Sequence, residues 1–85
     1  MYELYTANDK TEKRLNEYTR IRKDIREKLE RIKADPRREL DAHPLHGKLK
    51  GKWSCWLGYN IRMIYRIDDL NKKLIVEAVG SHKIY

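Results

Sequence analysis

One apolar stripe constrains the first half of the chain more than any other feature. Large apolar side chains recur there at intervals of three or four residues: Leu15, Tyr18, Ile21, Ile25, Leu29 and Ile32. That period places them along one side of an α-helix, opposite a side rich in lysine, arginine and glutamate. The stripe fits one long helix or two short helices broken near residues 19–21, and we expect it to pack into a core. Asn8, Asp9 and Thr11 are candidate N-caps, and Asp35-Pro36 predicts the end of the helical region.

The second half changes to the two-residue period of β-strands. Ile61, Met63, Tyr65 and Ile67 alternate with Arg62, Ile64 and Arg66. The first set is therefore predicted to face a core and the second the opposite side of a sheet. Segments 53–57 and 73–79 are similar, with turn residues at 58–60 and 68–71 between them. The sequence predicts an α+β fold: a short N-terminal strand at 2–6, a helical hairpin or long helix, then an antiparallel three-stranded meander with the helices on one face.

The size and the charge of the chain limit the class of protein and the kind of partner that we expect. The chain has 85 residues and one cysteine, so we expect a single domain over 1–85 without an internal disulfide, in the reducing cytoplasm. It contains neither a signal peptide pattern nor an apolar run long enough to cross a bilayer, so no membrane association is expected. The net charge is +7, and residues 43–85 carry eight Lys/Arg against three Asp/Glu. Such a basic surface favours a polyanion, and nucleic acid is the commonest one.

The excess of positive charge includes three alternating lysines between glycines. Lys48, Lys50 and Lys52 would project to one side if this stretch is extended. Three amines on one face would bind successive phosphates. The alternative interpretation is a solvated edge whose lysines prevent aggregation.

The residues with acid–base chemistry gather near one predicted end of the sheet. Arg62 begins one strand and His82 follows the next, and these ends are neighbours in an antiparallel pair. Arg62, His82 and Tyr85 are therefore expected to converge. This set suits cleavage of RNA by its own 2′-hydroxyl, which needs a base, cations for the phosphorane and an acid. A metal site is disfavoured because His43 and His46 flank Pro44 and are not on a regular helix, and no cofactor is expected.

Three segments together resemble the RelE/ParE superfamily of toxins, particularly its RelE, YafQ and YoeB ribonuclease branches. They are residues 43–54 (HPLHGKLKGKWS), residues 60–67 (NIRMIYRI) and residues 80–85 (GSHKIY). The resemblance covers residues 43–85 closely, whereas residues 1–42 match in layout alone. It implies a microbial RNase-like fold and a metal-independent mRNA endoribonuclease that acts on the ribosome. It also implies a RelB-like cognate antitoxin, with the toxin a monomer on its own and a hetero-oligomer in complex.

The resemblance also implies roles for individual residues. Arg62 matches the arginine that holds the scissile phosphate, and His82 the position of the general acid. Tyr85 matches the aromatic residue that stacks on or orients the base. For the general base, His46 or a lysine among Lys48, Lys50 and Lys52 lies in the matching region.

The chain departs from the family pattern at one place. Many relatives have a basic residue where Cys55-Trp56 stands. Trp56 cannot hold a phosphate, but it can stack on an RNA base. Two other functions stay open: a ParE-like inhibitor of DNA gyrase without nuclease activity, and a non-catalytic RNA-binding domain that uses its aromatic residues as stacking platforms.

Overall fold

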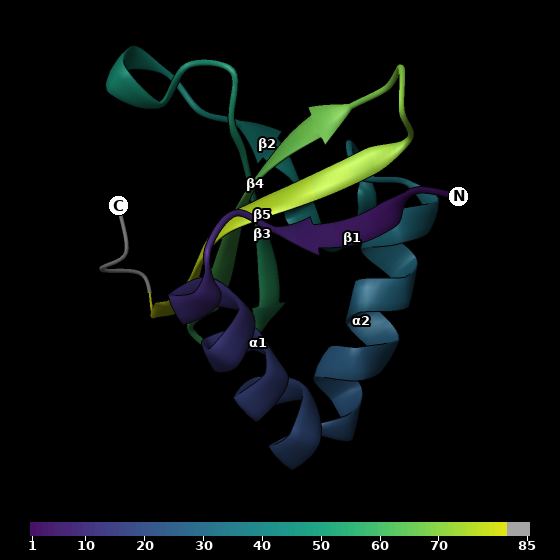
Figure 1. Cartoon of the computed structure of the whole chain (residues 1–85), viewed down its shortest axis with the longest axis vertical. Coiled ribbons are helices and arrows are strands. Elements are labelled where there is room, and N and C mark those ends of the chain that lie inside the picture. The colour runs from purple at the N-terminus through teal and green to yellow at the C-terminus, as the bar shows by residue number, and fades with distance from the viewer. Residues whose placement is uncertain (82–85) are drawn as a thin grey trace.

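The computed structural model describes residues 1–81, in which two helices cover one face of a five-stranded sheet (Figure 1). The elements in chain order are β1 (Glu3–Thr6), α1 (Asp9–Ile21), α2 (Lys23–Ala34), η1 (Glu39–Asp41), β2 (His43–Pro44), η2 (Gly47–Leu49), β3 (Trp53–Gly58), β4 (Ile61–Asp68) and β5 (Lys73–Ser81). The sheet order is β1-β5-β4-β3-β2, and β1 is parallel to β5 while the other pairs are antiparallel. The predicted α+β fold and its β3-β4-β5 meander are confirmed.

The helical region is a hairpin of two helices, not one long helix. Arg22 separates them with an extended backbone (φ −121°, ψ 110°), and its guanidinium binds the Asp24 carboxylate through two hydrogen bonds of 2.6 and 3.1 Å. Among the three candidate N-caps, Asn8 caps α1, because its side chain accepts a hydrogen bond of 2.8 Å from the Thr11 amide. Neither helix within residues 1–81 is long and apolar enough to cross a membrane.

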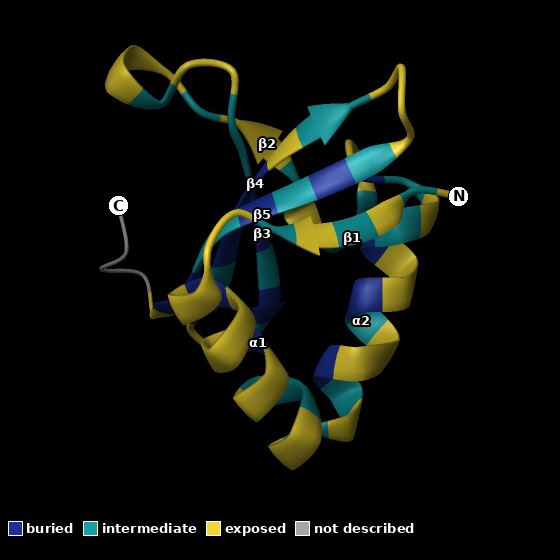
Figure 2. Ribbon diagram, in the orientation of Figure 1, coloured by how far each residue is buried: buried dark blue, intermediate teal, exposed yellow. Residues whose placement is uncertain are grey.

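The core lies between the helices and the sheet (Figure 2). Its buried members from the helices are Leu15, Ile25, Leu29 and Ile32, and those from the strands are Cys55, Leu57, Ile61, Met63, Tyr65, Leu74, Val76 and Val79. The predicted stripe is thus confirmed except at Ile21, which is 74% exposed because α1 ends there. Burial raises the pKa of the Cys55 thiol to about 12, so this side chain packs as a small apolar group.

Two contacts tie the segment after α2 to the sheet. The buried Tyr65 hydroxyl donates a hydrogen bond of 2.6 Å to the Pro36 carbonyl. The Arg37 guanidinium binds the Asp69 carboxylate at 2.7 and 3.1 Å, and it lies 5.7 Å from the centroid of the Trp53 ring. Hydrogen bonds from Arg37 and then Tyr2 lower the pKa of Asp69 to about 2. These contacts set where the chain enters β2 and β3.

Candidate functional site

The side of the sheet that the helices leave uncovered carries a row of cations. Arg62, Ile64 and Arg66 lie on this side because their neighbours on β4 belong to the core. Cross-strand pairing adds Ser54 and Trp56 from β3, and Ile75 and Ala78 from β5. Glu77 joins them through its ion pair with Arg66, and Lys52 through its ion pair with Glu77. We call this set the open face: Lys52, Ser54, Trp56, Arg62, Ile64, Arg66, Ile75, Glu77 and Ala78.

At one end of the open face, Arg62 stacks on Trp56. The two residues are direct cross-strand partners on β4 and β3, and the guanidinium carbon lies 4.1 Å from the centroid of the indole ring. On the other side Arg62 is paired with Gly80, which has no side chain to cover it. A stacked guanidinium keeps its N–H donors in its own plane, where a phosphate can meet them edge-on. Trp56 therefore orients the Arg62 guanidinium, and its stacking on a base stays a prediction.

At the other end of the open face, Glu77 bridges two cations. Its carboxylate lies 2.6 Å from the Lys52 ammonium and also accepts a hydrogen bond from Arg66 Nε. Burial favours the neutral acid, but the hydrogen bonds from Lys52 and Arg66 outweigh it and lower the pKa of Glu77. Lys52 was predicted to bind phosphate, and in the structure it contacts a carboxylate. Sequence reasoning missed Glu77 and the partnership of Arg66 with it.

The stretch that carries Lys48, Lys50 and Lys52 is not extended, so the three lysines do not form the alternating row that an extended chain would give, and phosphate binding by them stays a prediction. Residues 47–49 form the short helix η2, and Gly47 and Gly51 turn the chain with φ values of +66° and +92°. The Leu45 amide donates to the Lys52 carbonyl at 2.8 Å and closes this loop, which projects from the body at the upper left of Figure 1. Lys48 and Lys50 are exposed on it and do not extend the row of Lys52.

The structure separates the two histidines of the loop region. His46 precedes η2 and is exposed on the projecting loop. His43 lies on β2, in register with Ser54 of the open face. Its Nδ1 is 3.0 Å from the Asp41 carbonyl, so a proton held there leaves Nε2 as an acceptor. A role for His43 beside the open face was not predicted, because a two-residue strand beginning at His-Pro gives no periodic signal.

His82 and Tyr85 lie outside the described residues, so their convergence with Arg62 stays a prediction. What the structure describes is the strand that leads to them. Gly80 is the register partner of Arg62, and Ser81 that of Ile61. The chain therefore reaches residue 81 beside the end of β4 that carries Arg62.

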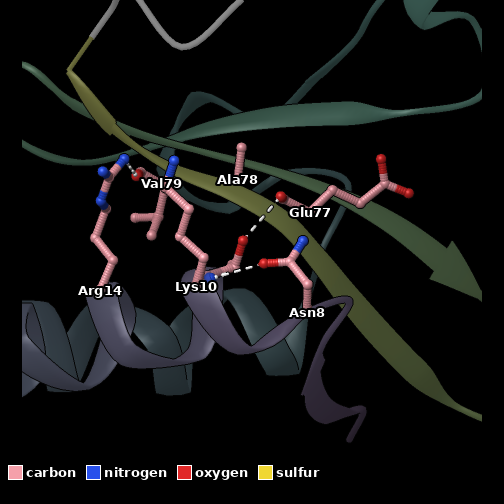
Figure 3. Close-up of a pocket in the computed structure, with 7 residues that line it drawn as sticks. Asn8, Lys10, Arg14, Glu77, Ala78 and Val79 are labelled. Carbon is pink, nitrogen blue, oxygen red and sulfur yellow. Dashed lines mark hydrogen bonds between the residues drawn. The ribbon is translucent and has the colours of Figure 1, made fainter.

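A separate hollow of about 270 Å³ lies between α1 and the edge of β5 (Figure 3). There the Thr11 hydroxyl donates to the Glu77 carbonyl at 3.0 Å and Arg14 donates to the Val79 carbonyl at 3.3 Å. Lys10 reaches toward the same strand, whereas the Glu77 carboxylate points away from the hollow. β1 pairs with β5 only as far as Val76, so these α1 side chains satisfy carbonyls that the sheet leaves without a strand partner.

Two helices on one face of a five-stranded sheet, with a basic opposite face, define a fold class that solved structures share. No protein-family model and no curated protein matches the chain. Among solved structures, a YoeB/ParE toxin from Agrobacterium tumefaciens is similar, with 22% identity and a TM-score of 0.75 over 94% of this chain and 98% of that one.

Two toxin–antitoxin complexes are also similar. The RelBE2 complex from Mycobacterium tuberculosis gives 23% identity and a TM-score of 0.75, and covers 95% of this chain and 98% of that one. The YoeB-YefM complex from Staphylococcus aureus gives 16% identity and a TM-score of 0.74, and covers 96% and 98%. The chain therefore has the fold of the RelE/ParE-type toxins, which confirms the fold that the sequence resemblance implied.

Proposed function

We propose that this chain, as a single domain over residues 1–85, is the toxin of a toxin–antitoxin pair and cleaves mRNA without a metal ion. One observation carries the proposal: Arg62 is stacked on Trp56 at the end of the open face, beside the strand that leads to His82. The shared fold and the three matching sequence segments support it. The same stack and cations would also serve RNA binding without catalysis, so measured cleavage decides between the two functions.

The proposed reaction is attack of an RNA 2′-oxygen on the adjacent phosphorus, which releases the 5′-oxygen of the next nucleotide and leaves a 2′,3′-cyclic phosphate. Arg62 holds the phosphate and stabilises the charge of the phosphorane. His82 gives a proton to the leaving 5′-oxygen, and Tyr85 orients the base. For the proton of the 2′-hydroxyl, His43 is better situated than His46, because its register partner lies on the open face.

The proposed partners are a RelB-like antitoxin and mRNA on the ribosome, in the cytoplasm. Two of the similar structures are toxin–antitoxin complexes. With Lys52, Arg62 and Arg66 on its open face, this chain suits a partner segment that is acidic and covers those cations. The toxin is a monomer alone and joins a hetero-oligomer with the antitoxin. Binding of the antitoxin is expected to protect Arg62 from solvent and to suppress cleavage.

The test measures cleavage of RNA, free and on programmed ribosomes, by the wild type and by Arg62→Ala and His82→Ala variants. Loss of the phosphate ligand or of the general acid is expected to slow cleavage by about 10²–10⁴-fold. Arg20→Ala is the matched control, since Arg20 is exposed on α1 and far in sequence from the open face. Single alanine variants of the candidate bases, His43, His46, Lys48, Lys50 and Lys52, identify the base by which of them loses activity. Full toxicity of the Arg62→Ala/His82→Ala double variant, with gyrase-dependent DNA breaks, would contradict the proposal in favour of a gyrase inhibitor.

A further inference from the structure

Glu77 is the acid among the nine residues of the open face, and a β-bulge places it there. Ile64 is in register with Ala78 and the next residue, Tyr65, with Val76, so Glu77 is an extra residue without a partner on β4. A bulge of this kind bends the strand and redirects a side chain. Here the redirected side chain meets two cations from different places in the chain, Lys52 before β3 and Arg66 on β4.

The geometry of this cluster matches that of a bound phosphate. One carboxylate oxygen of Glu77, Oε1, lies 2.6 Å from Lys52 Nζ, and the other, Oε2, accepts from Arg66 Nε. A phosphodiester likewise presents two non-bridging oxygens that share one negative charge. The Glu77 side chain is only 21% exposed, whereas those of Lys52 and Arg66 are 30% and 52% exposed. An RNA backbone can therefore reach the cations from solvent while the carboxylate lies beneath them.

We propose that Glu77 is an internal stand-in for an RNA phosphate, which holds Lys52 and Arg66 in place and which an RNA phosphate must displace or share. This inference rests on the proposed function, because it assumes that RNA crosses the open face. It makes Glu77 a residue that weakens RNA binding at the Lys52–Arg66 end and leaves the Arg62–Trp56 end to dominate. Non-specific contacts with the RNA backbone then add little to the affinity, and the contact of the scissile phosphate with Arg62 contributes a larger share of it.

The inference predicts a gain of binding from a Glu77→Gln substitution. The glutamine keeps the size of the side chain and releases both cations to bind phosphate. Each cation that neutralises a phosphate of single-stranded RNA adds about 0.7 to the slope of log affinity against log salt, so two add about 1.4. Glu77→Gln is therefore expected to bind a short single-stranded RNA more tightly than the wild type. Its advantage should shrink about sevenfold between 50 and 200 mM salt.

A matched control separates this local effect from net charge. Glu30→Gln makes the same change in charge and also releases a lysine, because Glu30 lies 2.6 Å from Lys33 Nζ, but it does so on α2. We expect Glu30→Gln to leave the salt slope nearly unchanged. Adding Lys52→Ala and Arg66→Ala to Glu77→Gln should remove the gain. Thermal unfolding of each variant shows whether the fold is kept. Glu77→Ala is a second, independent way to remove the carboxylate if Glu77→Gln does not fold.

The measurement is fluorescence anisotropy of a labelled RNA oligonucleotide as a function of salt, together with the cleavage rate. Tighter binding and a steeper slope in Glu77→Gln alone support the inference. If the wild type binds RNA and Glu77→Gln binds no more tightly than Glu30→Gln, the inference is wrong while the proposed function survives. Loss of cleavage in Glu77→Gln at unchanged affinity would instead make Glu77 a proton acceptor. If neither the wild type nor any variant binds or cleaves RNA, on or off the ribosome, both the inference and the proposed function are wrong.

Discussion

Replacing Tyr65 by phenylalanine tests how the segment after α2 is held to the sheet. Tyr65 has no exposed surface, and its hydroxyl donates to the Pro36 carbonyl at 2.6 Å. The substitution leaves the ring in the core but removes the donor, so the buried carbonyl loses this partner. Leaving a buried group without its hydrogen bond costs about 1–3 kcal/mol. In a domain of this size each kcal/mol lowers Tm by about 4–8 °C.

The assay is thermal and urea unfolding followed by circular dichroism, with Tyr59→Phe as the matched control. Tyr59 is 95% exposed at the β3-β4 turn, so removal of its hydroxyl should change the free energy of unfolding by less than about 0.5 kcal/mol. We expect Tyr65→Phe to lower Tm by several degrees and to keep the same urea m-value. Equal stability of Tyr65→Phe and Tyr59→Phe would refute the reasoning, because the Pro36 contact would then contribute nothing.

Three further results are expected. Asn8→Ala should lower the free energy of unfolding by about 0.5–2 kcal/mol, because the Thr11 amide loses its cap; an unchanged urea midpoint would contradict this. The Cys55 thiol should resist alkylation in the folded protein at pH 8, because burial raises its pKa to about 12. Above about pH 9 the thiol ionises in the unfolded chain before it does so in the folded protein, so the free energy of unfolding should fall as the pH rises from about 9 to about 12. Rapid labelling of native protein would show that Cys55 is accessible. RNA affinity of the wild type should fall steeply between 50 and 200 mM salt, and a flat response would remove the electrostatic basis for binding.

The parts of the fold that could be predicted from the sequence have a local, periodic cause. The helical stripe and the alternation along β4 each repeat over several residues, so the core faces of Leu15, Ile25, Met63 and Tyr65 followed directly. The choice between one helix and two depended on Arg22, whose extended backbone is accompanied by its contact with Asp24, and periodicity does not record such a contact. The parallel pairing of β1 with β5 joins residues about 70 positions apart, and a four-residue strand carries no signal of its partner.

The candidate site shows the same division. Arg62 was proposed because it lies near the start of one strand, beside the end of the next, and because it matches the family arginine. Its stacking on Trp56 was not predicted, although the two residues are register partners in the hairpin. Glu77 was missed because its position depends on a one-residue bulge, and such a shift moves side chains between the faces of a sheet. The lysine row depended on an extended chain, and it does not form because Gly47 and Gly51 adopt positive φ values and turn the chain.

The central claim, cleavage of RNA by its own 2′-hydroxyl at Arg62, is tested most directly by the chemistry of the product ends. The wild type and Arg62→Ala are incubated with a defined RNA on programmed ribosomes, which need Mg²⁺, and with the free RNA in the presence of EDTA. The fragments are analysed by mass spectrometry. The account predicts 2′,3′-cyclic phosphate and 5′-hydroxyl ends from the wild type, with the same rate of cleavage of free RNA whether or not EDTA is added. It predicts that Arg62→Ala lowers the cleavage rate by about 10²–10³-fold. Products with 5′-phosphate ends, or cleavage of free RNA that stops on addition of EDTA, would contradict it.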